Sequence, residues 1–229
     1  MEPAPGRFDG PPRERVFNAP LLAVLIALSM PALYLFQNAA PDHWMGLAFV
    51  PRDLADGRWI GLFGSMLLHG GWAHALMNAV GALTFGAPVA RVLPGPRGVP
   101  AFLALYITAG VVGALGYGLI HLDSAEPMVG ASGAVFGLIG GATRLLGGRG
   151  RVLALTDRRV ITSAVAWMAV NAVVGLIGFA PGAEGARIAW EAHAFGFLAG
   201  LLLIGPVVRI FGHPSSAFDS TGGLSDPRV

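Results

Sequence analysis

A serine stands among small residues near the middle of the chain, in the stretch Val129–Gly137. Ser132 follows a polar loop and opens an apolar, glycine-rich segment that predicts a helix. The first main-chain N–H groups of a helix have no partners within it, so they would stabilise an oxyanion formed when the Ser132 hydroxyl attacks a carbonyl. Gly130 can adopt backbone angles that are closed to other residues. Because a serine at this position more often caps its helix, the stretch alone leaves both interpretations open.

Three polar residues inside the apolar segments stand out: His74, Asn78 and His193. An ionisable side chain in hydrocarbon costs about 2.5–3.5 kcal/mol on insertion scales, so each needs a reason to be there. His74 and Asn78 are four residues apart and project from one face of a helix. Each side chain could instead join helices by hydrogen bonds, and this alternative stays open for each residue alone.

The composition is that of a membrane protein. Of the 229 residues, 54% are hydrophobic and 12% are charged, whereas about a quarter are charged in soluble domains. Cysteine is absent, which excludes disulfides, thiol nucleophiles and thiolate metal sites. The formal charge of +2 is too small to indicate nucleic-acid binding.

Apolar stretches predict six membrane-spanning helices, since a span needs about 20 residues. We expect them at about 17–36, 72–89, 101–120, 132–146, 160–179 and 187–211. The fourth is short, which is tolerated where its start is buried in protein and meets water inside the membrane. Between the second and third spans, Pro94–Pro100 is expected to form a turn-rich link.

The predicted fold is therefore an all-α membrane protein, a bundle of six transmembrane helices over residues 17–211. The segments 1–16 and 212–229 are expected to be disordered cytoplasmic tails. With six spans, twelve arginines fall on the side of the termini, and only Arg52, Arg58 and Arg187 fall on the other side. The positive-inside rule then places both termini in the cytoplasm and Ser132 toward the outside.

Two glycine stripes predict which helices meet. Small residues at every fourth position let membrane helices approach backbone to backbone. The stripes are Gly133, Gly137 and Gly141 on the fourth segment and Gly196 and Gly200 on the sixth. Their packing would bring Ser132 and His193 within side-chain reach, as a nucleophile and its base. Phe136 could support the imidazole, while His74, Asn78 and the Ser132 amide could donate to an oxyanion.

These residues resemble those of the rhomboid intramembrane serine proteases. The resemblance rests on three motifs in order: His69, His74 and Asn78; Gly130-Ala131-Ser132-Gly133; and Ala192-His193 followed by Gly196 and Gly200. It implies a Ser132–His193 dyad without an acidic third member, and an oxyanion hole of His74, Asn78 and the Ser132 main chain. It further implies cleavage of single-pass membrane proteins near the outer membrane face, in a water-filled cavity capped by residues 180–186.

The chain departs from the family pattern at two places. Family members often carry Tyr four residues after the serine, where this chain has Phe136. A Trp-Arg pair common in the first loop is reversed here as Arg58-Trp59, which puts the usual loop-anchoring contact in doubt. We expect Glu191 to be a polar rim residue, because it lies on a different helix face from His193. His69 is expected to be a structural hydrogen-bonder in the loop.

Other classes of function fit less well. A metalloprotease would need a ligand pair such as His-Glu-x-x-His, and His69 and His74 are five apart with no Glu between them. A transporter would more usually show inverted repeats. An inactive rhomboid relative that binds membrane clients typically lacks the Ser or the His. We therefore expect a protease of the cell (inner) membrane that opens to the extracytoplasmic side. It should use no cofactor, metal or nucleic acid and contact single-pass substrates and lipid, with its oligomeric state left open.

Overall fold

The computed structural model describes residues 19–148, 151–178 and 188–212 of the chain. Across these ranges the regular structure is helical, and the one β-pairing is an isolated bridge between Phe49 and Met128. The predicted tails at 1–16 and 212–229 and the predicted cap at 180–186 lie outside the described residues, apart from Gly212.

Five of the described helices are long and apolar enough to cross a membrane. They are α1 (Leu21–Ala39), α4 (Trp72–Val92), α5 (Gly95–Ile120), α7 (Arg158–Ile177) and α8 (Trp190–Phe211). A sixth apolar helix, α6 (Ser132–Thr143), has only 12 residues. The prediction of an all-α bundle of six membrane helices with a short fourth member is confirmed.

The expected turn-rich link at Pro94–Pro100 is wrong, because α5 already begins at Gly95. Pro94 is the N-cap of the helix and Pro96 lies in its first turn. A proline is compatible with the first turn of a helix, where its missing N–H would have had no partner. The C-terminal end of α6 also differs from expectation, because this helix ends at Thr143 and does not continue to about residue 146.

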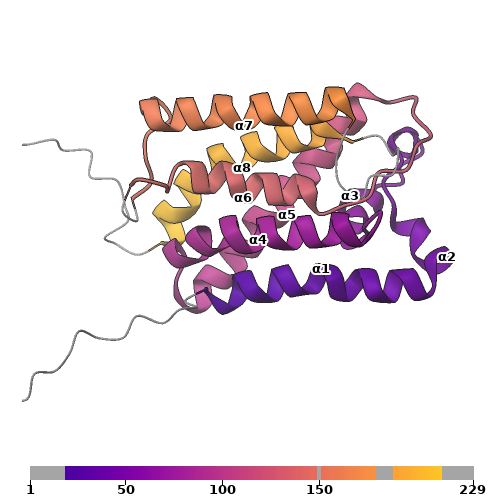
Figure 1. The fold of residues 1–229 in the computed structure, drawn as a ribbon, viewed down its shortest axis with the longest axis horizontal. Helices are drawn as coiled ribbons and strands as arrows, with labels where there is room; N and C mark the ends of the chain where they lie inside the picture. The colour runs from indigo at the N-terminus through magenta and orange to yellow at the C-terminus, as the bar shows by residue number, and fades with distance from the viewer. Residues whose placement is uncertain (1–18, 149–150, 179–187, 213–229) are drawn as a thin grey trace, which may run out of the picture.

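Helix α6 forms the centre of the bundle, and α1 and α7 lie at opposite edges of the view in Figure 1. Ten of the 12 residues of α6 are buried, including Ala134, Leu138 and Ala142 in the main hydrophobic core. By contrast, α7 buries only Val160 and Asn171 of its 20 residues. The short helix is therefore enclosed by protein, while α7 presents most of its apolar surface outward.

The predicted glycine stripes form the contact between α6 and α8. A Cβ atom on Gly200 would lie 1.8 Å from the Gly137 carbonyl oxygen, and one on Gly196 would lie 2.1 Å from that of Gly133. No side chain fits at either position. The two backbones can approach this closely only because both positions are glycine.

The connection between α1 and α4 forms a folded loop at the end of the bundle where α6 and α8 begin (Figure 1). Its short helices are α2 (Pro41–Trp44), η1 (Met45–Leu47), η2 (Pro51–Leu54), α3 (Gly61–Gly64) and η3 (Ser65–Leu67). Phe49 and Met128 exchange two main-chain hydrogen bonds of 3.0 and 2.7 Å. This pairing ties the loop to the segment that leads into Ser132.

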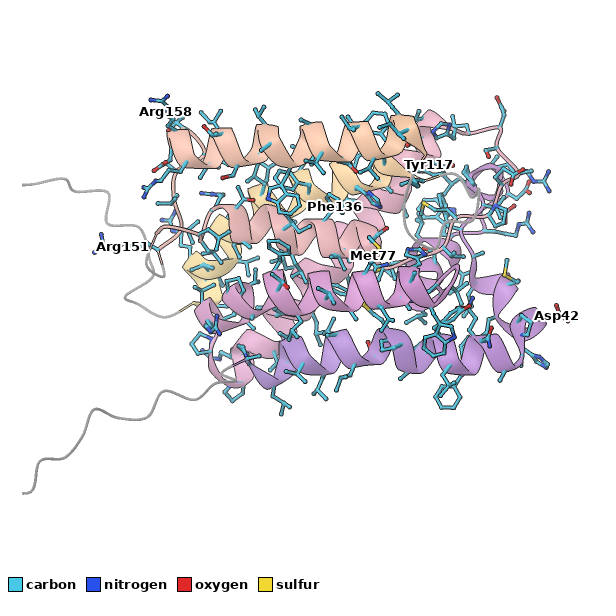
Figure 2. The ribbon with its side chains drawn as sticks, in the orientation of Figure 1. Asp42, Met77, Tyr117, Phe136, Arg151 and Arg158 are labelled. Carbon is cyan, nitrogen blue, oxygen red and sulfur yellow. The ribbon has the colours of Figure 1, made fainter. Side chains whose placement is uncertain are left out.

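The two ends of the bundle differ in charge. Arg151 and Arg158 lie at one end, and Asp42, a residue of α2, lies at the other (Figure 2). Arg91, in the last turn of α4, and Arg209, in the last turn of α8, lie at the same end as the start of α7. The side of the membrane on which each end lies stays a prediction from the positive-inside rule.

Candidate active site

Ser132 is the first residue of α6 and is not its cap. The N-cap is Ala131, which makes no side-chain capping hydrogen bond. The Ser132 hydroxyl instead contacts the imidazole of His193, with 2.8 Å between Oγ and Nε2. The capping interpretation of this serine is therefore wrong, and its Oγ is directed across the helix contact toward α8.

His193 lies in the first turn of α8, beside Ser132. Gly133 of α6 lies beside the main chain of Ala192, the neighbour of His193, and a Cβ atom on Gly133 would lie 3.5 Å from the Ala192 carbonyl oxygen. The imidazole stacks on Phe136, one turn after Ser132, with ring centroids 4.3 Å apart and planes 4° apart. An aromatic face at this distance holds the ring in one plane. The catalytic roles of Ser132 and His193 stay predictions, and their side chains are in contact.

The other nitrogen of His193 contacts a residue that the sequence reasoning missed. Nδ1 lies 3.0 Å from Oδ1 of Asn171, which is buried on α7. The Asn171 amide nitrogen also donates to the Trp190 carbonyl at 2.9 Å. The available signal was the same as for Asn78, namely an amide side chain within an apolar span.

His74 and Asn78 lie on one face of α4, as expected. The main-chain N–H of Gly70 donates to His74 Nδ1 at 3.2 Å, so a neutral His74 carries its proton on Nε2. Asn78 is buried and donates to the His74 carbonyl at 3.0 Å. Their assignment as oxyanion donors stays a prediction.

Gly130 separates His74 from Ser132. Its φ of 131° lies in the region that favours glycine. A Cβ atom there would lie 2.8 Å from His74 Nε2 and 3.6 Å from Ser132 Oγ. The donor edge of His74 and the Ser132 hydroxyl therefore face the same small space, which only a glycine leaves open.

His69 differs from expectation. Its main chain forms two hydrogen bonds with the Gln37 side chain, of 2.9 and 2.8 Å. Its fully buried ring, however, has no hydrogen-bond partner for either nitrogen among the described residues. Burial, with a smaller effect of nearby His74, lowers the pKa of His69 to about 4. The expected hydrogen-bonding role therefore belongs to the main chain of this residue and not to its side chain.

Glu191 lies away from the dyad, in agreement with its expected place on the rim. Its carboxylate is 3.1 Å from Nε2 of His121, whose ring packs at a tilt against the ring of Tyr117. All three residues line a cavity of about 310 Å³ that also touches Trp190. Glu191 is thus engaged with His121 from the loop after α5.

Two further expectations concern the first loop and metal binding. Arg58 forms ion pairs with Asp53 and Asp56 in its own loop, and Trp59 is 61% exposed. The reversed Arg-Trp pair therefore does not insert its indole into the fold. In the described ranges, no group of three or more His, Asp or Glu side chains is placed to hold a metal ion.

Comparison with known proteins gives a consistent result. Residues 56–210 match the Rhomboid domain family. The putative rhomboid protease YdcA of Bacillus subtilis (strain 168) is 29% identical over 191 residues, which cover 82% of this chain and 84% of YdcA. The RHOMBOID-like protein 9, chloroplastic, of Arabidopsis thaliana is 33% identical over 56% of this chain and 30% of that protein. The rhomboid protease GluP of B. subtilis is 28% identical over 55% of this chain and 22% of GluP.

Proposed function

The chain belongs to the rhomboid family, and we propose that it is a serine endopeptidase that cleaves single-pass transmembrane proteins near the outer membrane face. The observation that carries the proposal is the 2.8 Å separation between Ser132 Oγ and His193 Nε2. A hydroxyl at this distance from an imidazole nitrogen can lose its proton to that nitrogen as it attacks.

The chemistry follows from this pair. Ser132 Oγ attacks the scissile carbonyl while His193 Nε2 takes the hydroxyl proton. The oxyanion forms next to the start of α6, where the Ser132 amide, His74 Nε2–H and Asn78 supply donors. The protonated His193 then gives its proton to the departing amine, which leaves an acyl ester on Ser132. Water, activated by His193, hydrolyses this ester and frees the serine.

The length of α6 supports cleavage inside the membrane. Twelve residues at about 1.5 Å each make a helix of about 18 Å, shorter than the hydrocarbon layer of about 30 Å. If the Thr143 end is level with the ends of the longer helices, Ser132 lies well below the opposite surface. A substrate helix would then meet the nucleophile at a depth that soluble proteases cannot reach.

The charge at the two ends supports an orientation. The end with Arg151 and Arg158 would face the cytoplasm, and the end with Asp42 would face the extracytoplasmic side of the cell (inner) membrane (Figure 2). Ser132 begins α6 on the side of the bundle that faces this second end. We therefore place the cut toward the outer side of the substrate helix.

The proposal is tested with purified protein in liposomes, a single-pass reporter substrate and a serine-directed fluorophosphonate probe. Wild type should cleave the reporter and take up the probe, while Ser132→Ala and His193→Ala should lose cleavage and remain folded. Ser29→Ala is a matched control, because the Ser29 hydroxyl donates within α1, to the Ile26 carbonyl at 2.7 Å. Normal turnover by Ser132→Ala would end the proposal. A folded wild type that binds the reporter without cleaving it or taking up the probe would indicate a client-binding relative.

A further inference from the structure

Helix α7 buries two of its residues, Val160 and Asn171, and of these Asn171 has the polar side chain. Burying an amide in apolar surroundings costs free energy unless its hydrogen-bonding groups find partners. Asn171 is 4% exposed and finds two partners, both on α8. The least buried of the five long helices therefore contributes a satisfied polar group at the candidate active site.

One of these two bonds determines how the amide is oriented. The Trp190 carbonyl oxygen, 2.9 Å away, can only accept a hydrogen bond, so the amide nitrogen of Asn171 must face it. The amide oxygen then necessarily faces His193 Nδ1, at 3.0 Å. A main-chain carbonyl thus selects which atom of Asn171 meets the imidazole.

The amide oxygen in turn determines the tautomer of His193. An oxygen acceptor facing Nδ1 requires that Nδ1 carry the proton, and a neutral imidazole then has its lone pair on Nε2. That lone pair is the group that must accept the proton of the Ser132 hydroxyl, 2.8 Å away. The opposite tautomer would place two acceptors against each other at Asn171 and leave no base at Ser132.

We propose that Asn171 is the positioning residue of the His193 base, completing a relay from the Trp190 carbonyl through the Asn171 amide and the imidazole to Ser132. The inference rests on the proposed serine-protease function and adds a member to its dyad. When His193 is protonated, Nδ1–H continues to donate to the amide oxygen, whose dipole stabilises the added charge. A neutral amide suits an apolar span, where a carboxylate would carry a large desolvation cost.

The test compares two substitutions that keep a side chain branched at Cγ. Asn171→Leu removes both hydrogen bonds. Asn171→Asp keeps them if the buried carboxyl group is protonated, because its O–H then donates to the Trp190 carbonyl and its other oxygen accepts from His193 Nδ1–H. Met168→Ala is the control for loosened packing, because Met168 lies one turn earlier on α7 and packs on the main core. Each variant is assayed in liposomes for kcat, for KM as the mole fraction of substrate in lipid, for the rate of fluorophosphonate labelling and for thermal stability.

We expect Asn171→Leu to lower kcat and the labelling rate about three- to tenfold, the effect of one neutral hydrogen bond. KM should stay unchanged, because Asn171 contacts the base and not the substrate. Asn171→Asp should keep kcat within about threefold of wild type, and Met168→Ala should lower the stability while keeping kcat. If Asn171→Leu does not accumulate in the membrane, Asn171→Ala replaces it with the same expected losses.

Two results would overturn the relay. One is that Asn171→Leu has the same kcat and the same labelling rate as the wild type. The other is an equal loss of kcat in Asn171→Asp and Met168→Ala, since packing of α7 would then explain the effect. Ser132→Ala in the same assay separates the two proposals. If Ser132→Ala is inactive and Asn171→Leu is unaffected, the relay is wrong and the serine-protease proposal still holds.

Discussion

The main chain of Gly130 passes so close to the imidazole of His74 that a Cβ atom on Gly130 would lie 2.8 Å from both Cε1 and Nε2 of that ring. Gly130 also has a φ of 131°, outside the range that other residues readily adopt. Its amide N–H donates to the Ser65 carbonyl at 2.9 Å, which holds the segment in place. The backbone has little freedom to move away from the ring.

Replacing Gly130 with alanine should therefore displace His74 or the segment that carries Ser132. We expect Gly130→Ala to lower kcat at least about tenfold, since a displaced oxyanion donor costs a factor of this size or more. Gly46→Ala is the matched control, because a Cβ atom on Gly46 has nothing within 4 Å. Equal cleavage rates for the two variants would contradict this account of Gly130.

The glycines between α6 and α8 should differ in how much each contributes to the stability of the fold. A Cβ atom on Gly200 would lie 1.8 Å from the Gly137 carbonyl oxygen, whereas one on Gly141 would have no neighbour closer than 3.6 Å. We expect Gly200→Ala to destabilise the fold by about 1–3 kcal/mol or more, the usual cost of overpacking. Gly141→Ala should stay near wild type. Thermal unfolding in detergent compares the two, and similar midpoints would show that the helices separate at little cost.

The stacked pair of Phe136 and His193 predicts a rate effect that depends on an aromatic face. Phe136→Leu removes the ring that lies 4.3 Å from the imidazole. Aromatic pairs contribute about 0.5–1.5 kcal/mol, so we expect kcat to fall about two- to tenfold. Phe136→Tyr keeps the stack and should retain the wild-type rate. A larger loss in Phe136→Tyr than in Phe136→Leu would argue against stacking as the role of this residue.

Asn78 tests the predicted oxyanion hole. If its amide donates to the developing charge, Asn78→Ala should lower kcat about ten- to a thousandfold, the range for removal of one such donor. If Asn78 only supports the His74 carbonyl, to which it donates at 3.0 Å, the rate should change much less. Single-turnover cleavage of the reporter measures the difference, and a change of less than about twofold removes Asn78 from the oxyanion hole.

The hydrogen bonds of Asp157 predict that the free energy of unfolding depends on pH. Asp157 is the N-cap of α7, where its carboxylate accepts hydrogen bonds from the side chain and main chain of Arg159. The Arg159 side chain, followed by its main-chain N–H, lowers the pKa of Asp157 from 3.8 to about 2. A lowered pKa in the folded state means that the stabilisation is complete above pH 3.8 and is lost as the pH falls toward 2.

Asp157→Ala should therefore lower the unfolding temperature relative to wild type at pH 6, and the gap should narrow below about pH 4. Thermal unfolding of both proteins across this pH range gives the gap directly. A gap that stays constant down to pH 2.5 would mean that the charge of Asp157 does not contribute.

Much of the fold follows from local composition and spacing. About twenty apolar residues in a row are long enough to span hydrocarbon, so the spans could be located one by one. The glycine repeats at Gly133 and Gly196 also predicted a contact, because backbone approach depends on residue size alone. The start of α5 at Gly95 could not be predicted in this way, since a proline is compatible both with a turn and with the first turn of a helix.

The sequence by itself determined the residue types that could act as nucleophile, base and oxyanion donors, and the helices that carry them. The glycine stripes also predicted that Ser132 and His193 would meet, but only the tertiary structure decided which residue contacts the other nitrogen of His193. Asn171 stands 22 residues before His193 and looks in the sequence like any polar residue within a span. It meets Nδ1 because the packing of α7 against α8 brings an amide oxygen and an imidazole N–H within 3.0 Å. Hydrogen bonds depend on distance and direction between atoms, and these arise only when separate helices pack.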